Sequence, residues 1–151
     1  MSTLTHAPDL TQHPPRSPRV RLGGYVILPR MLDKGRASLN GKSGDYHYAC
    51  PMDQRFLDFA GIDAEKLKEQ LAAGAGEEEI LDWITANAAN KPSDWEIATW
   101  SAFQLQRTPG DVESKEYFIG LQSGISKTRE DLLTWFDILD WDDFVSYGGK
   151  P

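Results

Sequence analysis

Apolar and polar positions between residues 28 and 40 alternate with the period of an α-helix. Leucine or glycine at positions 28, 32, 35 and 39 forms a narrow apolar stripe along one face. Pro29 suits the first turn of such a helix, where its missing N–H group costs no hydrogen bond. We therefore expect a helix from Leu28 to the Asn40-Gly41 pair, which predicts a turn.

The chain after residue 50 carries further helical periods separated by capping residues. Pro51 opens a helix through Phe59, and Ser93 with Glu96 forms a capping box for a helix ending near Arg107. Other helices are expected to start near Asp63, Glu77, Asp111 and Thr128, with a break around Gly124. The pattern predicts an all-α single domain of about six or seven short helices. A small two-stranded element near residues 21–28 and 45–50 stays open as an addition.

Residues 1–20 have a different composition, with four prolines and few apolar side chains. Proline fixes φ and biases the preceding residue toward extended backbone, so this segment predicts an extended N-terminal arm or a frayed tail. Leu10 and Val20 give it apolar contacts through which it could dock. The expected division is a Pro-rich arm at 1–20 and a helical domain at 21–151.

Length and composition narrow the class of protein. A chain of 151 residues that is 40% hydrophobic and 26% charged suits one globular domain with its own core. No stretch approaches the roughly 20 apolar residues of a membrane span, and the N-terminus lacks the apolar region of a secretory signal. The single cysteine, Cys50, excludes an internal disulfide. We expect a soluble cytoplasmic protein that binds no membrane.

The net charge of −7 argues against a nucleic-acid partner, because such binding depends on a basic surface. The charge is unevenly placed: residues 1–50 hold seven Lys and Arg against three Asp and Glu, whereas the remainder holds nine against twenty. One interpretation is that the basic first third lies against the acidic remainder of the same fold. The other is a local anion site built from Arg30, Lys34 and Arg36.

The segment Asp45–Phe59 concentrates polar and aromatic side chains between a glycine loop and a helix, and is the best candidate site. His47, Cys50 and Asp53 are the catalytic candidates, because an imidazole and a carboxylate can activate a thiol. Asp58 is an alternative partner for the imidazole. A buried cysteine and a hydrogen-bonded structural turn are the competing interpretations. The candidate ligand-binding residues are Arg30, Lys34, Arg36, Tyr46, Tyr48 and Arg55.

The remaining motifs are weaker indications of a functional site. No spacing of His and Cys predicts a metal, and no cofactor is expected. Among the acidic residues near the C-terminus, Asp140 is expected to cap a helix. Asp142 and Asp143 are expected on the solvated surface. The five tryptophans are expected in the core. The alternative is that exposed tryptophans form a dimer interface.

Several short runs are similar to a known family. They are Pro15-Arg-Ser-Pro-Arg19, Leu22-Gly-Gly-Tyr-Val26, Leu28-Pro-Arg-Met31, Tyr46-His-Tyr48 and Asp53-Gln-Arg-Phe-Leu57. The chain resembles the uncharacterised bacterial family called domain of unknown function 5069, from about Asp9 to the C-terminal region. The resemblance implies a bacterial cytosolic protein of one domain whose Pro-rich arm belongs to the fold. It implies no activity, cofactor or catalytic residue.

The sequence leaves three functional hypotheses open and does not decide whether the chain is an enzyme. The first is an accessory module that binds a small ligand, anionic in one version, or a protein partner. The second is an enzyme that uses His47 as general acid or base on a small molecule. The third is a structural homodimer, so both a monomer and a dimer stay open.

Overall fold

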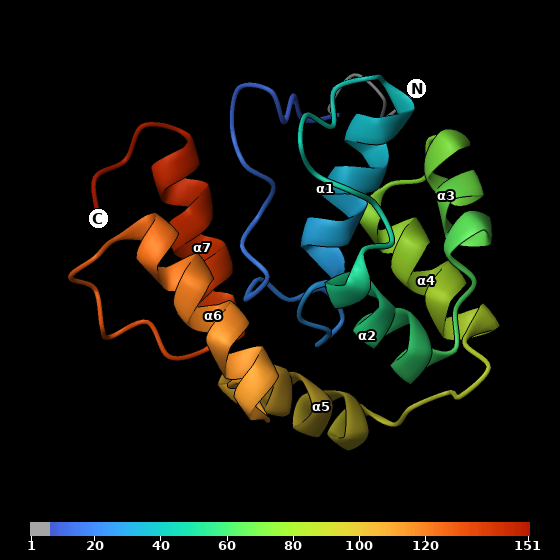
Figure 1. The fold of residues 1–151 in the computed structure, drawn as a ribbon. Coiled ribbons are helices and arrows are strands. Elements are labelled where there is room, and N and C mark those ends of the chain that lie inside the picture. Colours follow the sequence, from blue (N-terminus) through green and yellow to red (C-terminus); the bar gives the residue numbers. More distant parts are fainter. Residues whose placement is uncertain (1–6) are drawn as a thin grey trace.

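The computed structural model describes residues 7–151, which form seven α-helices and no β-strand (Figure 1). The helices are α1 Leu28–Leu39, α2 Pro51–Ala60, α3 Ala64–Ala72, α4 Glu77–Asn87, α5 Asp94–Gln106, α6 Val112–Ile125 and α7 Trp135–Ser146. The all-α prediction is confirmed. In place of the two-stranded element, residues 7–151 contain one isolated bridge, between Leu22 and Tyr25. None of these helices is both long and apolar enough to cross a membrane.

Helix α1 is the centre of the larger part of the molecule. It starts with Pro29 in its first turn and ends at Asn40, and every residue from Leu28 to Ala37 is buried. Gly35 allows α3 to pack closely, since a Cβ at this position would lie 2.6 Å from Leu71 Cδ1. Helices α1 to α5 enclose one large apolar core around Met31 and Phe56. The charged side chains of α1 are therefore buried too.

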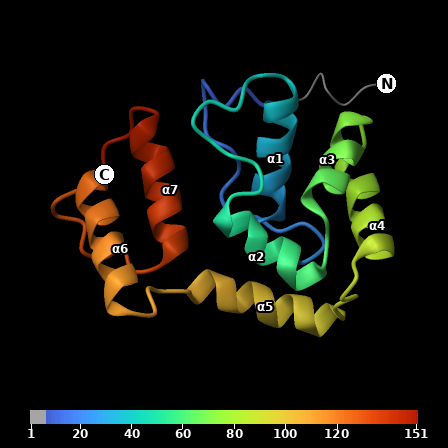
Figure 2. The ribbon, with the colours of Figure 1, turned by 45° about the vertical axis from the view of Figure 1, so that its right-hand side comes forward.

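Helices α6 and α7 form a hairpin with a smaller core of its own, packed around Phe118, Ile125, Leu132 and Ile138. Figure 2 shows the hairpin beside the α1–α4 group, with α5 running beneath that group and leading to α6. Helix α6 ends at Ile125, in agreement with the expected break around Gly124, whereas the prediction that the last helix starts at Thr128 was wrong.

The N-cap of α7 is Thr134, which forms a capping box with Asp137. Its hydroxyl accepts the N–H of Asp137, and the Asp137 carboxylate accepts the N–H of Thr134, both at 3.0 Å. Leu132 and Phe136 are spaced as on one face of a helix, although Leu132 lies before the start of α7. Its side chain packs into the small core from the loop before α7.

The N-terminal segment from residue 7 runs along α1 and reaches α7; residues 1–6 of the predicted arm lie outside the described residues. Leu10 is buried, its N–H donates to the carbonyl of Lys42 (2.9 Å), and its carbonyl accepts the hydroxyl of Tyr147 (2.5 Å). Pro15 and Pro18 are also buried. The segment thus touches both parts of the molecule.

Candidate functional site

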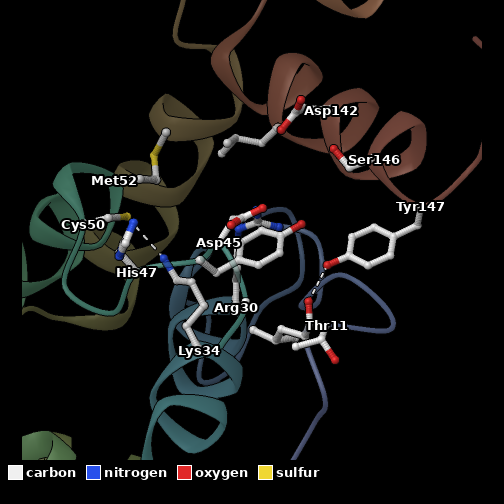
Figure 3. Close-up of a pocket in the computed structure, with 14 residues that line it drawn as sticks. Thr11, Arg30, Lys34, Asp45, His47, Cys50, Met52, Asp142, Ser146 and Tyr147 are labelled. Atoms are coloured by element: carbon white, nitrogen blue, oxygen red, sulfur yellow. Dashed lines mark hydrogen bonds between the residues drawn. The ribbon is translucent and has the colours of Figure 1, made fainter. Parts of the chain in front are cut away.

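A pocket of about 590 Å³ lies where the N-terminal segment, α1, the loop before α2 and the C-terminal end of α7 meet (Figure 3). These segments are far apart in the sequence, so only the folded chain brings their polar groups together. The lining residues are Leu10, Thr11, Arg30, Lys34, Gly44, Asp45, Tyr46, His47, Cys50, Met52, Leu139, Asp142, Ser146 and Tyr147.

One wall of the pocket is fixed by a buried ion pair between α1 and α7. The Arg30 guanidinium donates to both carboxylate oxygens of Asp143, at 2.7 and 3.3 Å, and the Tyr46 hydroxyl donates to the same carboxylate at 2.6 Å. Burial alone would lower the pKa of Arg30, but the hydrogen bonds and charge of Asp143 raise it. Burial, and then Asp143, raise the pKa of Tyr46. The positive charge of Arg30 is therefore balanced by Asp143 within the protein.

One turn further along α1 lies a second buried charge, Lys34, whose side chain is 4% exposed. Its ammonium Nζ lies 2.9 Å from Asp53 Oδ2 and donates to Cys50 Sγ at 3.2 Å. Asp53 is completely buried in the first turn of α2. Neither of its carboxylate oxygens accepts an aligned hydrogen bond from residues 7–151, so the contact with Lys34 is mainly electrostatic.

The mouth of the pocket carries polar groups that make no hydrogen bond within the described part of the chain. His47, Asp45 and Asp142 are exposed and line the pocket. The imidazole of His47 is bonded to neither Asp53 nor Asp58, the two partners expected for it. Partial burial, and then the charge of Asp143, raise the pKa of Asp142.

Three predicted ligand-binding residues lie outside the pocket, in contacts that hold the fold. Arg36 donates to the carbonyl of Ala75 at 3.3 Å, and Tyr48 donates to the carbonyl of Ala64 at 2.7 Å. Arg55 donates to the side chain of Gln104 at 2.7 Å. Arg30, Lys34 and Tyr46 are the predicted ligand-binding residues that line the pocket, together with His47 and Cys50 from the catalytic candidates.

Sequence reasoning missed the contribution of α7. Asp143, expected on the solvated surface, is 6% exposed and pairs with Arg30. Asp140, expected as a cap, lies inside the helix and pairs with Arg19 at 2.9 Å. Charge balance could have indicated these contacts from the sequence, because a central helix with buried basic residues requires acidic partners from other segments.

The ion pairs support the intramolecular interpretation of the uneven charge. Arg19, Arg30 and Lys34 from the basic first third bind acids of the remainder at 2.5–2.9 Å, and Arg16 contacts Glu77 as well as Asp33. Within residues 7–151 no group of three or more His, Cys, Asp or Glu side chains is placed to hold a metal ion. Trp95 is strongly exposed, whereas the other four tryptophans are partly buried.

Comparison with known proteins places this fold and pocket in a family. The model of the family described as "Domain of unknown function (DUF5069)" matches residues 12–145, which include ten of the fourteen residues that line the pocket. No curated protein matches the chain. The family has no assigned activity. The resemblance seen in the sequence is thus confirmed, and the chain belongs to the DUF5069 family.

Proposed function

We propose that the chain binds a small polar molecule in the pocket between α1, the 43–50 loop and α7. The observation that carries this proposal is the convergence of uncommitted polar groups on one cavity of about 590 Å³. That volume is within the range of small-ligand sites, which place a few polar groups in a preformed cavity. Buried ion pairs at Arg30 and Lys34 hold the walls in place before any ligand arrives.

The charges of the pocket favour a zwitterion over a simple anion. Arg30 and Lys34 are already compensated by Asp143 and Asp53, whereas the carboxylates of Asp45 and Asp142 make no ion pair or hydrogen bond within residues 7–151. An incoming ammonium group can pair with these carboxylates at the mouth. A ligand carboxylate can accept hydrogen bonds from Lys34 and His47. A free amino acid has both groups.

Thermal shift measurements with four compound classes test this proposal: amino acids, dicarboxylates, polyamines and sugar phosphates. Ser146→Phe fills the pocket from α7, and Ser123→Phe places the same ring on the exposed face of α6 as the matched control. We expect amino acids to raise the Tm of the parent and of Ser123→Phe but not of Ser146→Phe. No shift from any class, or shifts that persist in Ser146→Phe, would contradict ligand binding in this pocket.

Asp142→Asn separates the zwitterion from the anion. This change removes the charge that an ammonium group would meet and keeps the size of the side chain. We expect it to weaken the amino-acid shift, whereas binding of a pure anion would become stronger because one repulsive charge is lost. An unchanged amino-acid shift would exclude Asp142 as the ammonium partner.

An enzyme that uses His47 is the second candidate. The supporting observation is that this imidazole lines the pocket and is exposed, and histidine is the commonest general acid or base in enzymes. His47→Gln should then abolish turnover of a bound molecule while its thermal shift stays. Loss of both would make His47 a binding residue only.

The free thiol also supports a location for the protein. Cys50 has no disulfide partner, and its side chain is partly exposed in the pocket. Such a thiol persists best in the reducing cytoplasm, so we propose a bacterial cytoplasmic protein. Fractionation of producing cells is the corresponding test, and recovery from the cell envelope would contradict it.

A further inference from the structure

Cys50 occupies a position in the pocket that suits a nucleophile. It is the N-cap of α2, with φ −66° and ψ 171°, and its partly exposed side chain lines the pocket. The Lys34 ammonium lies 3.2 Å from its Sγ (Figure 3). A nearby ammonium and a helix N-terminus both stabilise a thiolate, which is the reactive form of cysteine.

The buried Lys34–Asp53 pair is hard to explain as a stabilising contact. Charges taken out of water lose hydration, and apolar residues of similar volume often stabilise a fold equally well. Asp53 is completely buried, and its Oδ1 meets no donor among residues 7–151. A buried carboxylate oxygen without a hydrogen-bond partner is rare in folded proteins and needs an explanation, of which a role in a functional site is one. The contact with Asp53 fixes the Lys34 ammonium beside Cys50.

The start of α2 also offers free hydrogen-bond donors beside the sulfur. Pro51 has no N–H, and no side chain caps this helix. The N–H groups of Met52 and Asp53 have no acceptor within the described residues. Because an N-cap side chain lies next to these N–H groups, an oxygen on a carbon bonded to Sγ can reach them. Backbone donors in this arrangement stabilise the oxyanion of acyl transfer.

We propose that Cys50 is a nucleophile that accepts the acyl group of a small ester or thioester held in the pocket. The inference rests on the proposed binding of small molecules in this pocket, and it adds small esters and thioesters as a substrate class. The thiol loses its proton to solvent, and the thiolate attacks the carbonyl carbon to form an S–C bond. The carbonyl electron pair moves to oxygen, next to the N–H groups of Met52 and Asp53. When the intermediate collapses, the alkoxide or thiolate departs with its bonding pair.

Acylation by p-nitrophenyl acetate at neutral pH tests this inference in the intact protein. The reference is a peptide of residues 47–53, which has the same thiol and imidazole but lacks Lys34 and the folded helix. We expect a burst of nitrophenolate, one acetyl group on Cys50 by mass spectrometry, and a rate at least about tenfold above that of the peptide. Cys50→Ser should remove the burst. Acetylation of Cys50 no faster than the peptide would overturn the proposal.

A pair of variants isolates the role of Lys34. The double change Lys34→Met with Asp53→Leu removes both buried charges together, which avoids leaving one uncompensated. We expect its acylation rate to fall about tenfold, toward that of the peptide. Lys42→Met, an exposed lysine outside the pocket lining, should keep the parent rate. Equal rates in parent and double variant would exclude the ammonium as the activating group.

The outcomes separate this inference from the binding proposal. Amino-acid thermal shifts that survive in Cys50→Ser, together with slow acylation of the parent, would keep the pocket and remove the nucleophile. Fast acylation of Cys50 without any thermal shift would keep the nucleophile and remove the amino-acid ligand.

Discussion

The two helical parts of this protein are stabilised in different ways. Helices α1 to α5 share a large core with completely buried side chains such as Met31, Phe56 and Leu67. The α6–α7 hairpin has four buried apolar side chains in its own core. From α7, Phe136 is buried in the large core and the partly buried Leu139 packs against it. By its own burial the hairpin is therefore the weaker region.

Polar contacts provide much of the attachment between the two parts. Arg19 bridges Asp137 and Asp140 at 2.5 and 2.9 Å, and Arg30 with Tyr46 holds Asp143. The pocket lies along this boundary. A boundary with charged contacts on one side and a cavity on the other can respond to a ligand more readily than a continuous apolar core.

The largest expected difference between the two cores comes from removing one phenyl ring from each. Phe56→Ala should cost about 4 kcal/mol, because Phe56 is enclosed on every side. Phe118→Ala should cost less, about 3 kcal/mol, because the small core collapses around the cavity more easily. Urea unfolding measures both. A larger loss for Phe118→Ala would reverse the ranking of the two regions.

The buried ion pair gives the next largest effect. Asp143→Leu leaves the Arg30 guanidinium buried without its counter-charge and should cost about 3 kcal/mol. The double variant Arg30→Met with Asp143→Leu should recover most of that loss. Asp131→Leu breaks an exposed pair with Arg129 and serves as the control, with no measurable change expected. If the double variant recovers nothing, the pair itself stabilises the boundary.

Acid should loosen the hairpin before the large core. Partial burial opposes it, but hydrogen bonds from Thr134 and Leu133 and the charge of Arg19 hold the pKa of Asp137 below its usual value. A lowered pKa gives stability that is present above the unfolded-state pKa of about 3.9 and is lost as pH falls through the folded-state value. Below roughly pH 4, NMR signals of α7 should therefore broaden first. Simultaneous loss of signals from α1 would contradict this order.

The smallest predicted effect is a gain in stability at Asp142. Its raised pKa means that the folded state favours the protonated form, so the ionised carboxylate opposes folding at neutral pH. Asp142→Asn should raise the Tm slightly at pH 7, and the difference should vanish below roughly pH 3, where both states are protonated. Thermal unfolding at both pH values checks the sign. A lower Tm at pH 7 would show that Asp142 makes a stabilising contact.

Local signals predicted most of the helices, because capping chemistry acts within a few residues. The Ser93–Glu96 capping box and the Asp63 and Asp111 caps appear as predicted. Thr134–Asp137 is an equally good start signal, but the spacing of Leu132 to Phe136 favoured an earlier start. Leu132 is apolar because the small core needs it, and not because it is helical.

The site was less accessible from sequence, because its key contacts join distant segments. Lys34 and Cys50 are 16 residues apart, and Arg30 and Asp143 are 113 apart. Local pattern placed His47, Cys50 and Asp53 together but could not show that Lys34 lies between the thiol and the carboxylate. It also could not distinguish Arg30, in the pocket, from Arg36 on the same helix.

Native-state hydrogen exchange tests the central claim. This claim is that the α6–α7 hairpin, whose helix α7 lines one side of the pocket, has a lower unfolding free energy than the α1–α5 core. Amides of α6 and α7 should exchange through openings of lower free energy than those of α1 and α2. Arg30→Met with Asp143→Leu should change the hairpin values most. If all four helices exchange only through one global unfolding with the same free energy, the molecule has one cooperative core and the two-part account is wrong.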